Sequence, residues 1–321
     1  MINHRSSEQI GIRARHLRLA AGVATLTLSL LGCSKAPDSL RTGVPATGIA
    51  ATVQVNLPIG SQQAQVTGTV YRNAVAQPLV GGDVLQAKTD QSLTTLHSIE
   101  NLSGNYAGLL FVDHPATTVD VAVNYDQKAS AEDRWFGSDN LLVNPGPGSL
   151  VGYSVPGMTF PQEVFFASPV ANTKYVTPAD IITVNWTPVN EGNQMRLSEA
   201  VACVSQGQTY RYGLVQTLGI EGQDAGAAGS YSLSVGALVG GTQVAVTLTN
   251  VAEYIALVST AVYLGLEPQQ LVNGSALIGT IERCDIDLTL FRESNNPLPA
   301  SFSGGYAITS RSDTVRIQYA P

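Results

Sequence analysis

The stretch TVDVAVNY, residues Thr118 to Tyr125, alternates apolar and polar or small side chains along its length. Val119, Val121 and Val123 occupy every second position, and the positions between them carry aspartate and alanine. Because successive side chains of a β-strand point to opposite faces, this period of two predicts a strand with one buried face. An amphipathic helix would need a period of 3.6, which the stretch does not have.

The same period recurs on both sides of this strand. Val53, Val55 and Leu57 alternate with polar or small residues, and so do the apolar residues of 314–319. Turn signals such as Pro58 to Gly60 recur throughout, and no amphipathic helix pattern intervenes before about residue 250. Closely spaced strands without crossover helices pair antiparallel in sandwiches. The sequence therefore predicts an all-β protein with two antiparallel β-sandwich domains in tandem.

A region rich in proline and glycine marks the expected division between the two domains. Residues 138–161 read SDNLLVNPGPGSLVGYSVPGMTFP, and an apolar run begins at Val164. A chain of this size is near the point at which one hydrophobic core divides into two. We therefore predict a first β-sandwich over residues 48–160 and a second over residues 161–321.

Three short motifs characterise the first domain. They are VTGTVY at residues 66–71, QPLVGGDV at 77–84 and GNY at 104–106. This order resembles the carboxypeptidase-regulatory-like, transthyretin-like sandwich, which has a glycine-containing strand, a P-L-x-G turn and a G-x-Y strand start. The match covers residues 66–106. The resemblance implies a small module that usually has no catalysis of its own.

The second domain opens with FASP at residues 166–169 and TPADIITVNWTP at 177–188. These segments look like the first strands of an Ig-like or fibronectin-like sandwich, with Trp186 as its core tryptophan. Ile182 and Val184 would share the buried face of Trp186. The alternative is that this tryptophan forms an exposed platform for an aromatic cofactor or a sugar. The whole order of motifs resembles uncharacterised two-domain lipoproteins of the bacterial envelope.

One segment of the second domain breaks the β pattern. Asn250 and Glu253 have the spacing of a helix N-cap and its reciprocal acidic residue, and Val251 to Leu264 is almost wholly apolar. A helix that is apolar all round has to be covered. We expect a helical insertion over about 250–275 that packs over an open end of the sandwich. The alternative is an element that binds a partner or lies on a membrane.

The first 33 residues have the order of a lipoprotein signal. Four arginines precede the uncharged run Leu19 to Gly32, which is too short to span a bilayer. The sequence Leu30-Leu31-Gly32-Cys33 resembles the lipobox of bacterial lipoproteins. The resemblance implies that signal residues 1–32 are removed and that Cys33 carries fatty acyl chains such as palmitate. Two or three chains make anchoring stable. The alternative is an ordinary signal peptide with an unmodified cysteine.

Composition and charge after the signal exclude some partners. The chain has 17 basic and 24 acidic residues, and residues 1–32 hold four arginines and Glu8, which leaves 13 against 23, a net charge of −10. Nucleic acid is therefore an unfavourable partner.

Residues 33–47 are rich in proline and glycine and predict a flexible tether. Ser34 after the cysteine resembles lipoproteins sorted to the outer membrane, so we expect a protein facing the periplasm or the cell surface.

The two remaining cysteines, Cys203 and Cys284, form an even pair in a compartment where disulfides persist. We predict that they are bonded to each other. Cys284 would share a buried strand face with Ile286 and Leu288. The alternative is two separately buried thiols. A metal site is not predicted, because two cysteines without further ligands at the right spacing cannot complete a tetrahedral shell.

Residues with catalytic chemistry are sparse. His97 and His114 are the histidines that follow the signal, and both lie in segments typical of surfaces. No G-x-S-x-G elbow and no P-loop occurs. Asp285 and Asp287 are two residues apart on one strand and share a face, a spacing that a glycosidase could use and that any exposed acidic strand also produces. We therefore predict neither an enzyme nor a bound cofactor or metal.

These observations favour a membrane-anchored envelope lipoprotein that acts as a non-enzymatic structural or interaction module. The alternative is an envelope protein that binds or hydrolyses polysaccharide. Glu132 and Trp135, in the loop sequence EDRW, are its candidate ligand-binding residues, because an aromatic ring among charges can stack on a sugar.

Overall fold

The computed structural model describes residues 46–99, 102–114, 116–126, 149–190, 192–205, 207–239 and 281–321. The expected signal, Cys33, most of the tether, the Glu132 and Trp135 loop and the helical insertion lie outside the described residues. The strands are β1 (Ile49–Pro58), β2 (Gln63–Arg72), β3 (Val75–Ala76), β4 (Asp83–Lys88), β5 (Leu93–Thr95), β6 (His97–Ser98), β7 (Asn105–Phe111), β8 (Val119–Tyr125), β9 (Ser154–Met158), β10 (Phe165–Ser168), β11 (Lys174–Tyr175), β12 (Ile181–Thr187), β13 (Gln194–Ser205), β14 (Gln208–Ile220), β15 (Ser230–Ser234), β16 (Ile281–Asn296) and β17 (Gly304–Tyr319). The helical elements are η1 (Ala225–Ala227) and α2 (Val235–Val239).

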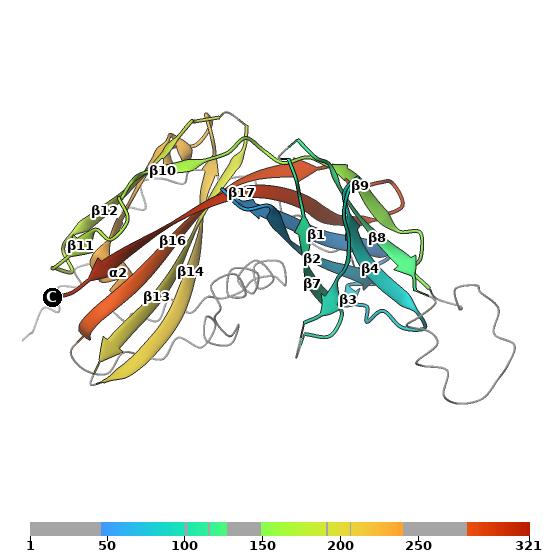
Figure 1. The fold of residues 1–321 in the computed structure, drawn as a ribbon, viewed down its shortest axis with the longest axis horizontal. Helices are drawn as coiled ribbons and strands as arrows, with labels where there is room; N and C mark the ends of the chain where they lie inside the picture. The colour runs from blue at the N-terminus through green and yellow to red at the C-terminus, as the bar shows by residue number, and fades with distance from the viewer. Residues whose placement is uncertain are drawn as a thin grey trace, which may run out of the picture. The chain divides into compact units, whose positions relative to one another are not determined.

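The described strands form three sheets (Figure 1). The largest has ten strands, with the order β14-β13-β16-β17-β1-β2-β7-β6 and with β3 and β11 at its sides. The second sheet has the order β10-β12-β15, and the third has the order β5-β4-β8-β9. The all-β prediction is confirmed. Most pairs are antiparallel, and β17 adds two parallel pairs, with β1 and with β11.

The first hydrophobic cluster packs the β5-β4-β8-β9 sheet against β1, β2 and β7. Val119, Val121 and Val123 of β8 are buried, as their alternation predicts. They meet the inward residues of β1, such as Val55, and of β2, such as Val66. Each fully buried side chain of this kind stabilises the fold by about 1.5–3 kcal/mol relative to exposure.

The second cluster packs the β10-β12-β15 sheet against β13, β16 and β17. Trp186 is 3% exposed and lies in this core, so its burial is confirmed and the exposed platform is wrong. Cys203 and Cys284 are directly opposed on β13 and β16 and form the predicted disulfide. Cys284, Ile286 and Leu288 share the buried face, as expected.

The last strand, β17, contributes to both clusters. Val315 and Ile317 of β17 lie in the second cluster, whereas Ala307 of the same strand lies in the first. Gly305 pairs with Ala51 of β1 at a φ of +103°, where an added Cβ would lie 1.9 Å from the Ala51 carbonyl oxygen. Glycine is therefore required at this point of the parallel pair. The boundary near residue 160 stays a prediction, and β17 belongs to both sides of it, because it pairs with β1 as well as with β16.

Candidate functional site

A polar stretch interrupts the inward face of β16 and β17 between the two clusters. Along β16 this face changes from Leu288 and Leu290 to Arg292 and Asn296, and along β17 it changes from Val315 to polar residues. Arg292 is directly opposite Arg311 on β17. We call the following residues the polar junction: Arg292, Asn296, Thr309, Arg311 and Asp313 of the two strands, their partner Glu221, and the segment 159–166.

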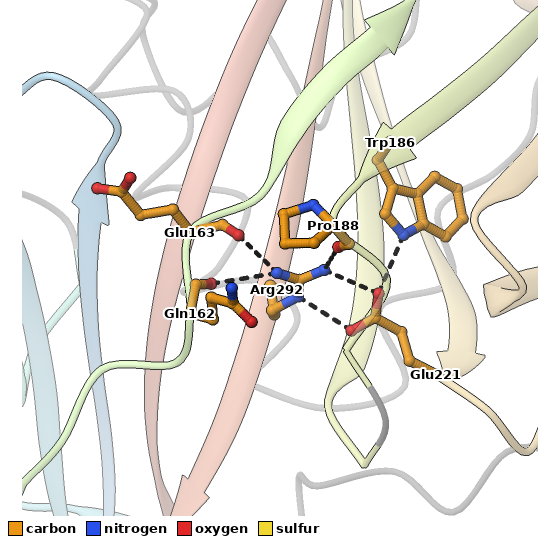
Figure 2. Close-up of polar contacts among 6 residues, drawn as sticks. All are labelled: Gln162, Glu163, Trp186, Pro188, Glu221 and Arg292. Atoms are coloured by element: carbon orange, nitrogen blue, oxygen red, sulfur yellow. Dashed lines mark hydrogen bonds and ion pairs between the residues drawn. The ribbon is translucent and has the colours of Figure 1, made fainter.

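Arg292 is the centre of the polar junction and is fully buried (Figure 2). Its Nε donates to Glu221 Oε2 at 2.9 Å, and its Nη2 donates to Glu221 Oε1 at 2.9 Å and to the Pro188 carbonyl. Its Nη1 donates to the carbonyls of Glu163 at 2.6 Å and Gln162 at 3.4 Å. The five donors of the guanidinium therefore all have acceptors, which is the condition under which a buried charge is tolerated.

The Glu221 carboxylate connects this arginine to the second hydrophobic core. Trp186 Nε1 donates to Glu221 Oε1 at 3.0 Å, from the opposite side to Arg292 (Figure 2). Glu221 is itself fully buried and follows directly after β14, so β12, β14 and β16 meet at one carboxylate. Since a charge-assisted hydrogen bond is about twice as strong as a neutral one, this arrangement holds the three strands in register.

Segment 159–166, which joins β9 to β10, is fastened along the polar junction. Thr159 N donates to Asn296 Oδ1 at 2.9 Å, and Thr309 Oγ1 donates to the Thr159 carbonyl. Phe166 N donates to Asp313 Oδ2 at 2.8 Å. The backbone of the segment thus finds its hydrogen-bond partners in the side chains of β16 and β17.

Arg311 makes the second ion pair of the polar junction. Its Nη2 lies 2.5 Å from Glu163 Oε1, and its side chain is 2% exposed, whereas that of Glu163 is 40% exposed. Burial lowers the pKa of Arg311, and the charge and hydrogen bond of Glu163 oppose that shift. Arg311 Nε and Nη1 have no hydrogen-bond partner, so this arginine is less completely satisfied than Arg292.

A further buried carboxyl lies in the second core, away from the polar junction. Glu199 of β13 is fully buried, and its Oε1 accepts a hydrogen bond from Gln216 Nε2 of β14 at 2.9 Å. Tyr231 of β15 donates to Gln216 Oε1. The hydrogen bonds from Tyr231 to Gln216 and from Gln216 to Glu199 therefore connect one sheet to the other. Glu199 Oε2 has no hydrogen-bond partner. Burial raises the pKa of Glu199 to about 8.

The carboxylates considered for glycoside hydrolysis are engaged by neighbours on β17. Asp287 forms a two-point ion pair with Arg316, at 2.7 Å for both Nε and Nη2. Asp285 Oδ1 accepts from Gln318 Nε2 at 3.2 Å. The structure therefore places both aspartates in cross-strand pairs.

The two histidines that follow the signal lie apart from both buried networks. His97 is an exposed residue of β6, and His114 accepts a hydrogen bond from Ala116 N at an exposed turn. In the described ranges, no three His, Cys, Asp or Glu side chains gather as a metal site would require. Within the same ranges no helix is long and apolar enough to cross a membrane.

The residues of the polar junction were not predicted from the sequence, although a signal for them exists. The apolar positions of β16 run through Cys284, Ile286, Leu288 and Leu290, and the next position in the same period is Arg292. A charged residue on the buried side of a strand requires a paired partner. The pattern indicates that Arg292 has a partner but does not identify Glu221, which lies 71 residues earlier.

Comparisons with known proteins were made at the level of sequence and of structure. No protein-family model matches the chain, and no curated protein matches it. A DUF4785 family protein from Legionella pneumophila is similar in structure at 8% identity and a TM-score of 0.24, over 75% of this chain and 52% of that one. The FN1–FN3 domains of chicken CNTN1 are similar at 13% identity and a TM-score of 0.23, over 87% of this chain and 68% of that one.

This chain therefore spans about half the length of the Legionella protein. At such TM-scores the two likenesses carry no argument about this protein. Its assignment as a β-sandwich protein rests on its own strands and their two hydrophobic clusters.

Proposed function

We propose that the protein is a non-enzymatic structural module of the bacterial cell envelope, anchored by lipid on Cys33. In this proposal residues 33–47 form the tether, and the β-sheet part that follows works as one mechanical unit. The proposal has two parts, the anchor and the mechanical unit, and different residues support each of them.

The polar junction is the observation that supports the mechanical part. Arg292 and Glu221 are fully buried, and the donors of the arginine are all used within the chain. An arginine in this state is not free to bind a substrate, but it fixes segment 159–166 and the end of β14 against β16. The part of the junction around Arg292 and Glu221 is fully satisfied, and a satisfied polar network rigidifies the structure around it. Since β17 also contributes to both hydrophobic clusters, we expect the two halves to resist separation.

The engaged carboxylates support a role without hydrolysis. General acid catalysis by a carboxyl group needs a proton and access to the substrate. Asp287 makes a two-point contact with Arg316, and Asp285 accepts a hydrogen bond from Gln318. In this proposal both aspartates serve the pairing of β16 with β17.

The anchor is supported by the lipobox-like sequence alone, and it gives a direct test. We expect the native protein, purified from the membrane fraction, to begin at Cys33 and to carry diacylglyceryl and amide-linked acyl mass on that residue. Cys33→Ser should move the protein out of the membrane fraction, because a serine lacks the thiol that receives the lipid. The matched variant Ser34→Ala should stay with the membrane. A native N-terminus before residue 33, or a Cys33 without acyl mass, would contradict the anchor.

A further inference from the structure

Among the residues that the structure describes, strand β14 is the outermost strand at one end of the ten-stranded sheet (Figure 1). Twelve of its 13 residues pair with β13 from Gln194 to Ser205, and no described strand pairs with its other side. A strand in this position presents a row of unpaired backbone N–H and carbonyl groups. The edge is therefore a template on which another strand can pair.

The other edge strands in the described part of the chain are much shorter. β5 has three residues, β6 has two, β10 has four, and β9 and β15 have five each. β9 also contains Pro156 and Gly157, and the pairing of β10 shifts register between Phe166 and Ser168. Short length, proline and bulges are the devices by which proteins prevent edge pairing. β14 is long and has no proline, and its one register shift against β13 falls at Leu218, just beyond residue 217.

The sequence of β14, QTYRYGLVQTLGI, also lacks the charges that protect an edge. Arg211 is its one charged residue, and Thr209, Arg211 and Thr217 are exposed. η1 packs against the backbone of Leu218, where an added Cβ at Gly226 would lie 2.5 Å from the carbonyl oxygen. The stretch open to pairing is therefore 208–217.

We propose that β14 pairs antiparallel with β14 of a second copy of this chain. A two-fold axis perpendicular to the sheet sets the strand against itself, which makes a closed, isologous contact. In such a dimer Arg211 faces an uncharged residue of the second copy, unless the two-fold axis passes through Arg211 itself. The chain after the signal has a net charge of −10, so most surfaces of two copies repel, whereas this edge carries one positive charge and no negative one.

A spin-label experiment on the full-length protein in excess detergent tests this contact. Thr217→Cys places a label on β14, and Thr183→Cys places the matched label on an exposed position of the inner strand β12. We expect a defined distance between two labels at residue 217 of no more than about 45 Å, because 13 residues at about 3.4 Å each set that limit. If the two copies met through β12 instead, the labels at residue 183 would lie closer together than those at residue 217, which would contradict the proposal.

A charge variant separates pairing at this edge from association elsewhere. Thr209→Lys with Thr217→Lys adds two positive charges to each edge, so like charges gather along the contact for any axis within residues 208–217, which is destabilising. We expect sedimentation to show a dimer that weakens about tenfold in this variant and does not weaken in Thr183→Lys with Thr187→Lys. A protein that stays monomeric at every concentration up to about 100 μM, where interfaces of ordinary affinity form dimers, would overturn the proposal. A dimer unaffected by the β14 lysines, or one that forms only with a different protein's strand, would also overturn it.

Discussion

Replacing Arg292 by methionine is expected to lower the free energy of unfolding by about 3–5 kcal/mol, because removing one partner of a buried ion pair leaves the other charge uncompensated. The Glu221 carboxylate would keep the Trp186 N–H as a donor but would lose both contacts from the arginine. The carbonyls of Gln162, Glu163 and Pro188 would lose their donor as well. Urea unfolding of the variant and the parent protein measures the difference.

Arg316→Met is the matched control for this change. Arg316 also makes a two-point ion pair, with Asp287, but its side chain is 60% exposed. An exposed pair contributes about 0–1 kcal/mol. If Arg292→Met costs no more than the control, the polar junction does not hold the fold together. If Arg292→Met does not fold, the double change to methionine at Arg292 and leucine at Glu221 should restore folding, because apolar replacements of a whole buried pair are often tolerated.

Glu199→Gln is expected to stabilise the protein at pH 8 by about 2–4 kcal/mol and to leave it nearly unchanged at pH 4.5. The pKa of Glu199 rises from 4.5 to about 8 because of burial. Between these pH values the folded carboxyl keeps a proton that the unfolded chain has released. Stability from this group is therefore fully present below pH 4.5 and is lost as the pH rises through about 8. Glutamine is neutral at every pH, so the stability of the variant lacks the pH dependence that Glu199 causes.

The comparison should be made as a difference between the variant and the parent protein at each pH, so that other groups cancel. Tyr231, whose pKa is raised by burial and by Glu199, is the titrating neighbour that faces this carboxyl from β15. Glu282→Gln, at an exposed position of β16, is the control, and a surface substitution of this kind changes stability by no more than about 0.5 kcal/mol. A flat profile for Glu199→Gln would show that Glu199 is ionised in the folded protein.

Strands were predictable from the sequence where one face is consistently apolar. The alternation in residues 118–125 was sufficient for β8, and the same reasoning placed Trp186 and Cys284 on buried faces. In each case burial follows from local sequence, because a period of two assigns a face without knowledge of the partner strand.

The pairing of distant segments was not predictable in the same way. β1 pairs in parallel with β17, and nothing local to Ile49–Pro58 indicates a partner some 250 residues later. The polar junction also depends on distant segments, because Glu221 lies 71 residues before Arg292 and Gln162 lies 130 residues before it. Glu199 was missed for a related reason, since its neighbours Gln216 and Tyr231 come from two other strands.

Native-state hydrogen exchange tests the central claim, that shared strands and the polar junction make the two clusters one cooperative unit. The amides of Val121 in β8 and Val184 in β12 report the first and the second cluster. We expect both to exchange through the same global opening, with free energies that agree within about 1 kcal/mol and with the same dependence on denaturant. Opening of one cluster at a lower free energy than the other, with a smaller denaturant dependence, would contradict the account.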